Sequence, residues 1–402
     1  MRKLGTTVAI LLALALAIPG AAAGQKGPKV AAQSDNIKLV KQFRIVGGGE
    51  LAALGKFVYS GQANGGPEFN RGSEADEGGI HIYDASGKKP RKAGFLHCPG
   101  TDNDVEIVRP GLATMSFSGN MCAPSAGTGL MTIDVSNPKK PRVLGAIQTG
   151  KAHTHKPYPG KPLVYMAGGG LTPGGNAGPA IVDVSKPSKP EVVATTQTIT
   201  MDCHDISFHI TKDKKLMFCP GAIGTGEVQI FDVSDPLAPQ LVGKIYNPLI
   251  QYSHYAVASS DGNLLAIDDE AFALHECHTG NSPTGRVWIY DISNPALPLL
   301  QSSFAPPRGG DGTVGHFVGW VPSWCLSHGL DWQPGTRNLA VTWFTGGVSV
   351  LDLRDPLSPQ ELAFHQFEDS ATFSALWHKG LLYTNDTRWG VQAYEIKGLP
   401  KK

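Results

Sequence analysis

One unit recurs along this chain, an apolar strand that ends in an acid and runs into a turn closed by proline. Seven copies are present, the last of them degenerate, and their acids are Asp84, Asp134, Asp183, Asp232, Asp291, Asp352 and Glu395. Successive acids lie 50, 49, 49, 59, 61 and 43 residues apart. This spacing is typical of propeller blades and not of helical solenoids. The repeat therefore predicts a ring of blades with a functional site at one end.

The fourth copy shows how one blade is built. Its strands are expected at 203–210, 216–219, 227–233 and 240–245, with a proline-bounded corner between the last two. The final copy has no room for a fourth strand after Glu395, whereas residues 37–46 form a strand that belongs to no other copy. We therefore expect an all-β, seven-bladed β-propeller of four-stranded blades over residues 36–402, closed by the N-terminal strand.

The N-terminus predicts export. Arg2 and Lys3 precede a short apolar run and the small residues 21–23, a pattern typical of a signal peptide over residues 1–23. Residues 24–35 are expected to form a disordered leader, and no later run is long enough to span a membrane. Loss of Arg2 and Lys3 takes the formal charge from +1 to −1, which does not favour nucleic acid as a partner. We expect a periplasmic or extracellular protein.

The repeats resemble those of bacterial, exported LVIVD-repeat β-propeller proteins. The resemblance rests on the apolar triplet, Asp-Val-Ser and Pro-x-x-Pro unit at Asp134, Asp183 and Asp232, and it extends over nearly the whole mature chain. It implies the propeller fold. It brings no catalytic motif with it, because a fold of this kind supports many functions.

Histidines begin the innermost strands of four consecutive blades. Alignment on the repeated acids places His155, His204, His254 and His328 at nearly the same point of blades three to six, with Arg109 at the equivalent point of blade two. Imidazoles converging on one axis without intervening acids favour a transition metal, copper or iron ahead of zinc. The alternative is structural: each ring binds a neighbouring blade and holds the ring together. The arrangement, and no sequence motif, resembles carotenoid-cleavage oxygenases and selenium-binding, methanethiol-oxidase-like proteins.

The long loops are predicted at the same end of the ring as the histidines. One of them carries the tract His-Glu-Cys-His at 275–278, which resembles a metal-ligand tract but matches no standard zinc spacing. From this loop Glu276 and His278 join Arg109 as candidate catalytic residues. Long loops on a rigid scaffold usually carry recognition, so we expect a small-molecule substrate here, with a protein partner as the alternative.

The six cysteines fit three disulfides. The blade scheme pairs Cys98 with Cys122, Cys203 with Cys219, and Cys277 with Cys325, as suits an oxidising compartment. Thiolate metal ligands are the competing interpretation.

Three functions are compatible with these patterns. The first is a metalloenzyme of redox or lyase type with the four histidines as ligands. The second is a non-enzymatic adhesion or scaffold propeller that binds a protein or another ligand. The third is a metal-free lyase or hydrolase that uses histidine, Arg109 and a loop carboxylate as acid and base.

Overall fold

The structure is a computed structural model. It describes residues 27–45, 48–62, 78–100, 104–119, 122–123, 127–168, 178–196, 202–221, 226–270, 285–307, 326–368 and 370–401. These residues form strands and turns, and no helix occurs among them. None of the described segments could therefore cross a membrane as an apolar helix.

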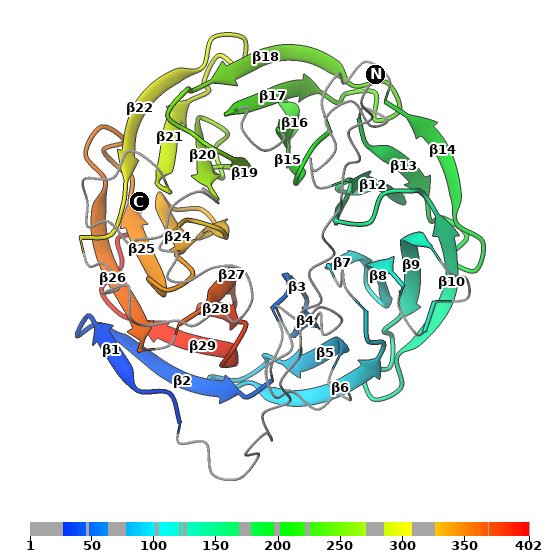
Figure 1. The fold of residues 1–402 in the computed structure, drawn as a ribbon, viewed down its shortest axis with the longest axis horizontal. Coiled ribbons are helices and arrows are strands. Elements are labelled where there is room, and N and C mark those ends of the chain that lie inside the picture. Colours follow the sequence, from blue (N-terminus) through cyan, green and yellow to red (C-terminus); the bar gives the residue numbers. More distant parts are fainter. Residues whose placement is uncertain are drawn as a thin grey trace, which may run out of the picture.

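Seven antiparallel sheets stand around a common centre, as the prediction required (Figure 1). From the inside outwards, blades one to four are β3 (Leu51–Leu54), β4 (Phe57–Gln62), β5 (Gly79–Asp84), β6 (Arg91–His97); β7 (Val105–Arg109), β8 (Leu112–Ser118), β9 (Thr128–Asp134), β10 (Arg142–Gln148); β11 (Thr154–Pro157), β12 (Leu163–Ala167), β13 (Ala180–Asp183), β14 (Glu191–Thr195); and β15 (Ser207–Ile210), β16 (Lys215–Pro220), β17 (Glu227–Asp232), β18 (Gln240–Tyr246). Blades five to seven are β19 (Ser253–Ala258), β20 (Leu264–Asp269), β21 (Val287–Asp291), β22 (Leu299–Phe304); β23 (Leu330–Trp332), β24 (Asn338–Thr342), β25 (Val348–Asp352), β26 (Gln360–Phe367); and β27 (Thr372–His378), β28 (Leu381–Asp386), β29 (Gly390–Ile396), β2 (Ile37–Phe43).

The N-terminal strand closes the ring as predicted. β2 pairs antiparallel with β29, so the first and last parts of the chain form one blade (Figure 1). The expected disordered leader was wrong over part of its length, because β1 (Val30–Gln33) pairs with β26 and adds a fifth strand to blade six. The main-chain groups of β26 would otherwise form an open sheet edge, which β1 covers.

The repeated acid closes a tight turn at the end of each third strand. In blades one to six its Oδ1 accepts the backbone N–H of the residue two positions later, at distances between 2.7 and 3.0 Å. This contact is an Asx turn, a geometry that a short carboxylate forms readily. The turn starts the proline-bounded corner and sends the chain to the rim of the blade.

The corners of blades two to six each pack against the blade before them through the carbonyl of their first proline. The Pro138, Pro187 and Pro295 carbonyls lie where a side chain would otherwise begin at Gly94, Gly145 and Gly243. In the other two blades a hydroxyl meets the carbonyl instead: Ser302 Oγ donates to Pro356 O at 2.6 Å, and Tyr165 donates to Pro236 O. The corner therefore locks successive blades together.

Apolar side chains fill the spaces between blades. Eight clusters of buried residues are found in the described part of the chain. Seven of them lie one at each of the seven blade interfaces, including the interface between blades seven and one that closes the ring. Because each blade shares a core with both neighbours, the ring forms one structural unit.

We define the end of the ring at which the innermost strands begin as the entry end.

Two of the three predicted disulfides are present. Cys98 bonds to Cys122 beside blade two, and Cys203 bonds to Cys219 within blade four. The third predicted pair, Cys277 with Cys325, lies outside the described residues.

Replacement of Gly243 by alanine tests the corner contact. A Cβ at this position would lie 1.9 Å from the Pro295 carbonyl oxygen, so the two blades must move apart. We expect Gly243→Ala to lower the free energy of unfolding by about 2 kcal/mol, measured by denaturant titration. Gly87→Ala is the control because a Cβ there meets nothing within 4 Å. Equal stability of the two variants would contradict the proposed lock.

His365, in the outer part of blade six, provides a test of pH dependence outside the histidine cluster. Burial lowers the pKa of this ring from the ordinary 6.5 to about 4. The unfolded chain therefore binds a proton below pH 6.5 that the folded chain does not bind, and folding becomes less favourable as the pH falls. When the pH is lowered from 7 to 5, we expect His365 to lower the free energy of unfolding by about 2 kcal/mol.

The measurement is the free energy of unfolding at both pH values. His365→Gln should flatten this pH dependence, whatever its effect at pH 7. His97→Gln, which changes an exposed ring, serves as the control and should leave the dependence unaltered. An unchanged slope in His365→Gln would contradict the assignment.

Candidate metal centre

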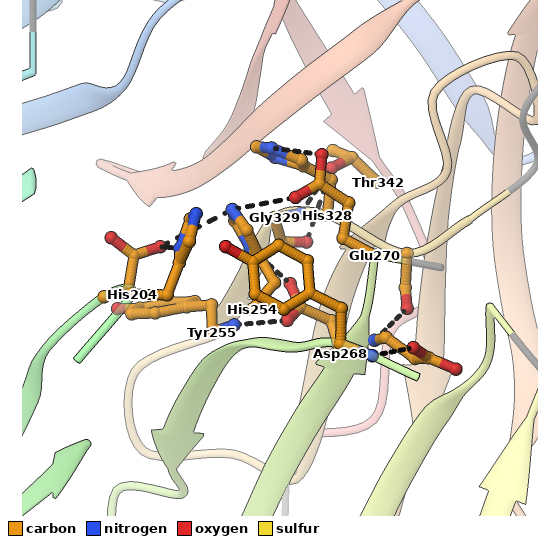
Figure 2. A network of polar contacts seen from close by, with 12 residues as sticks. His204, His254, Tyr255, Asp268, Glu270, His328, Gly329 and Thr342 are labelled. Carbon is orange, nitrogen blue, oxygen red and sulfur yellow. Dashed lines mark hydrogen bonds and ion pairs between the residues drawn. The ribbon is translucent and has the colours of Figure 1, made fainter. Parts of the chain in front are cut away.

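Three histidine rings from three consecutive blades lie in a row at the entry end. The ring centroids of His204 and His254 are 4.2 Å apart, and those of His254 and His328 are 4.1 Å apart. Figure 2 shows the three rings side by side, with Glu270 next to His328. All three side chains are buried. The sequence prediction that these three histidines converge is therefore correct.

Each ring comes from the start of an innermost strand. His254 is the second residue of β19, whereas His204 and His328 precede β15 and β23 by three and two residues. The Cys203–Cys219 disulfide and the hydrogen bond from His204 N–H to Pro220 O at 3.0 Å hold the segment before β15 against β16. The rings therefore start from backbone that is fixed on two sides.

One nitrogen of each ring already has a hydrogen-bond partner. His254 Nδ1 lies 3.4 Å from Asp268 Oδ2, and His328 Nδ1 lies 2.9 Å from the Phe373 carbonyl oxygen. Both acceptors require a proton on Nδ1, so the Nε2 lone pair of each ring is free. The Nε2 atoms of His204 and His153 are 2.9 Å apart. When His204 is the donor in that contact, its proton is on Nε2, and the lone pair on its Nδ1 is the one that could bind a metal ion.

Two carboxylates lie between the rings. Asp205 Oδ2 is 3.7 Å from both His204 Nδ1 and His254 Nε2. The two oxygens of Glu270 lie 3.7 Å from His254 Nε2 and from His328 Nε2. The expectation of imidazoles without intervening acids was therefore wrong. The strand expected over residues 203–210 includes Asp205, but β15 begins at Ser207, so Asp205 does not follow the alternation of the strand.

The separations fit the ligands of one ion. His204, Asp205 and His254 form one group, and His254, Glu270 and His328 form another, with ligand atoms within 4.8 Å of one another in each. Ligands about 2.1 Å from one ion lie about 3 to 4 Å apart, and the 3.7 Å separations fall in this range. His254 Nε2 belongs to both groups, so the two groups share one ligand, and each of them has the separations of a site for a single ion.

Asp269 pins the backbone that carries the acids. Its Oδ1 accepts the N–H groups of Gln251 and Tyr252 at 3.0 and 2.9 Å, and its Oδ2 accepts that of Gly285 at 2.9 Å. Its own N–H donates to Ser327 Oγ, next to His328, at 3.0 Å. Asp268 and Glu270, on either side, are therefore held towards the rings.

Burial determines the charges of the cluster. It lowers the pKa values of His204 and His254 well below the ordinary value, and that of His328 to about 4. Burial, together with the charges of Asp205 and Asp269, raises the pKa of Glu270 well above its ordinary value. The imidazoles are therefore neutral at pH 7, as a metal ligand requires, and a bound cation would favour the ionised form of Glu270.

His155, the fourth predicted ligand, is turned away from the cluster. It is buried with Nδ1 3.0 Å from Asp104 Oδ2 and Nε2 2.9 Å from Thr114 Oγ1, both in blade two. Its place beside His204 is taken by His153, whose ring centroid is 4.4 Å from that of His204. His155 thus has the structural role of joining blades that the sequence left open as the alternative.

Arg109 lies away from the predicted position. It is the last, exposed residue of β7 and leads into the turn to β8, at the end of the ring opposite the histidines. The sequence alignment assigned Arg109 to the start of the innermost strand because the repeats were aligned on their acids and not on this strand. Asp104, just before β7, occupies the position at the entry end. Glu276 and His278 lie outside the described residues, as does the rest of the 275–278 tract.

Sequence reasoning missed four side chains of the centre. They are His153, Asp205, Asp268 and Glu270. His153 stands two residues before His155 in the same His-Thr-His segment, so an error of two positions in the alignment exchanged them. Asp268 and Glu270 end the second strand of blade five, a position at which no other blade offers the same pair of acids.

The comparisons with known proteins agree with this architecture. The LVIVD repeat model matches residues 125–149, 175–198 and 285–305, which hold the third and fourth strands of blades two, three and five. No curated protein matches the chain.

Solved structures similar to this chain are β-propellers. The β-propeller domain of Myceliophteria thermophila Cps50 (Swd1) has a TM-score of 0.57 at 11% identity over 90% of this chain and 100% of that chain. Saccharomyces cerevisiae Sqt1 has a TM-score of 0.50 at 10% identity over 91% of this chain and 87% of that chain. Identities this low establish the fold alone. The chain is a seven-bladed β-propeller that carries LVIVD repeats.

Proposed function

We propose that this protein is an exported metalloprotein that binds one divalent transition metal ion at the entry end of the ring. The ligands are His254 and His328 through Nε2 and the carboxylate of Glu270, while His204 and Asp205 form a neighbouring group that shares His254. One observation carries the proposal: three buried, neutral rings have one nitrogen engaged and direct the other at shared carboxylates. A bound cation would give these buried nitrogen and oxygen atoms the partner that offsets the free-energy cost of burying them.

The mixed nitrogen and oxygen donors favour iron(II) over copper. Two imidazoles and one carboxylate, the set formed by His254, Glu270 and His328, are typical of non-haem iron(II), with zinc as the alternative for the same donors. Copper(I) favours softer sulfur ligands, and the four described cysteines are in disulfides. Of the two metals that the sequence favoured, copper and iron, iron therefore fits these ligands better.

The bound ion would act on a small molecule. An ion held by fewer protein groups than its coordination number accepts water, or a substrate with oxygen or nitrogen donors. Iron supplies redox chemistry when bound, which supports an oxidoreductase, and zinc supplies Lewis acidity, which supports a lyase. Export rests on the N-terminal pattern, and the two disulfides support an oxidising compartment.

Metal analysis tests the centre. Purified protein loaded anaerobically with iron(II), and separately with zinc(II), should retain about one ion per chain after desalting. His254→Ala should abolish retention because His254 Nε2 belongs to both ligand groups. Glu270→Gln, which removes a charged ligand, should weaken it by more than about 100-fold, the upper end of the loss for a residue that only orients a ligand. The matched control is His155→Gln, which removes a buried histidine of the neighbouring blade and should keep the ion.

Two results would contradict the proposal. One is a wild-type chain that retains no iron or zinc while circular dichroism shows it folded. The other is equal retention by wild-type protein and His254→Ala.

Asp268 is expected to orient a ligand without touching the ion. Its Oδ1 accepts the Tyr255 N–H and its Oδ2 lies against His254 Nδ1, so Asp268→Asn places an amide N–H against one of these donors. We expect metal affinity to fall about 10- to 100-fold, measured by competition with a chelator. Unfolding of the metal-free protein provides the second readout. A loss of stability with full metal affinity would assign Asp268 a purely structural role.

A further inference from the structure

The six proline-bounded corners fall into two chemical classes. The two residues just before the last proline of each corner include lysine in blades one to three and leucine in blades four to six. The pairs, in blade order, are Lys88-Lys89, Lys139-Lys140, Ser188-Lys189, Leu237-Ala238, Ala296-Leu297 and Leu357-Ser358. Because the corners are equivalent by repeat, this difference is not a requirement of the fold.

All six corners lie at the end of the ring opposite the metal centre. In a four-stranded blade the turns after the first and third strands emerge at the same end, away from the start of the first strand. Contacts agree with this placement, because Lys214, in the first turn of blade four, donates to the Gly262 and Ser293 carbonyls at 3.0 and 3.3 Å. Gly262 belongs to the first turn of blade five and Ser293 to its corner.

The leucines of blades four to six are exposed. The exposed fractions are 46% for Leu237, 68% for Leu297 and 68% for Leu357, and Leu299 and Leu300 beside them are 62% and 51% exposed. Three adjacent blades thus present apolar tips on one side of a single face. Neighbouring exposed leucines of this kind are a frequent feature of protein interfaces.

The same halves differ in charge. The corners of blades one to three carry six lysines and no acid between their third and fourth strands. Those of blades four to six carry Asp235, Asp355 and Arg354, and the last is held by Asp352 at 2.6 Å. The acid that ends each third strand is common to all six blades and does not contribute to the difference. The face therefore has a basic half and an apolar half with exposed acids.

We propose that this face binds a second copy of the chain through a two-fold axis. An axis in the plane of the face that passes through blade seven maps blade one onto blade six, blade two onto blade five and blade three onto blade four. Blade seven has no such corner, since its fourth strand is β2. Each basic corner then meets an apolar or acidic corner, and Lys89 meets the region of Asp355. The two-fold pairing makes the face complementary to itself.

A lipid surface fits the face less well. Asp235 and Asp355 stand two residues before exposed leucines, and their Oδ1 atoms accept the N–H groups of Leu237 and Leu357 at 3.0 and 3.1 Å. Insertion of these tips into an anionic membrane would bring carboxylates against negative headgroups. A second copy brings lysines to the same acids. The pairing also leaves both metal centres facing outwards, and it does not depend on metal binding.

Sedimentation equilibrium of the purified chain at micromolar concentration tests the proposal. We expect a dimer at low salt, and association about tenfold weaker in 0.5 M NaCl because the charges are screened. Leu297→Lys with Leu357→Lys should give a monomer. These substitutions place at the corners the residues that blade two carries there, Lys140 and Lys139, so the corner can accommodate them. Tyr246→Lys, at a 70% exposed residue at the entry end, is the control.

A charge exchange makes the test specific. Asp355→Lys should weaken the dimer, and Lys89→Asp added to it should restore association, because the two positions meet across the axis in both directions. A monomer at low salt would overturn the proposal, as would a dimer that the two leucine substitutions leave unchanged. Sedimentation of monomers with phosphatidylserine vesicles would assign the face to lipid and also overturn it.

Discussion

Contacts between the corners of blades two to six and the blades before them set the geometry of most of the ring. An Asx turn ends the third strand, and the proline carbonyl that follows enters a space left by glycine or meets a hydroxyl of the neighbouring blade. Repeated from blade to blade, this contact holds the sheets at one relative height. The innermost strands therefore begin at one end of the ring, and equivalent positions of different blades face one another there.

This register brings together groups that are costly to bury. Two groups of three side chains, one with His204 and Asp205 and one with Glu270 and His328, lie within ligand distance around the shared His254. Asp268, His153 and the Phe373 carbonyl determine which ring nitrogen is free. Burial raises the pKa of Glu270 and lowers those of the rings, so charged forms of these groups are unfavourable when no cation is bound. A divalent ion would offset this cost by direct ligation, which is the physical basis of the proposed function.

The sequence was sufficient for the features that repeat. The acids predicted the number of blades, the missing strand after Glu395 predicted closure by β2, and the positions of cysteines in the blades predicted two disulfides. The sequence was not sufficient to predict the direction in which a single side chain points. His155 and His153 differ by two positions, yet one packs against Asp104 and Thr114 while the other meets His204. Asp205 departs from strand alternation because it precedes the strand. Such orientations depend on neighbouring blades, which a pattern along the chain does not contain.

X-ray absorption at the metal edge of the loaded protein tests the central claim most directly. The expected spectrum shows scattering from nitrogen and oxygen ligands alone at about 2.0 to 2.2 Å, with outer-shell scattering from two imidazole rings. The outer-shell signal should fall by one ring in His328→Ala. Sulfur scattering at about 2.3 Å, or a spectrum without imidazole scattering, would contradict the account.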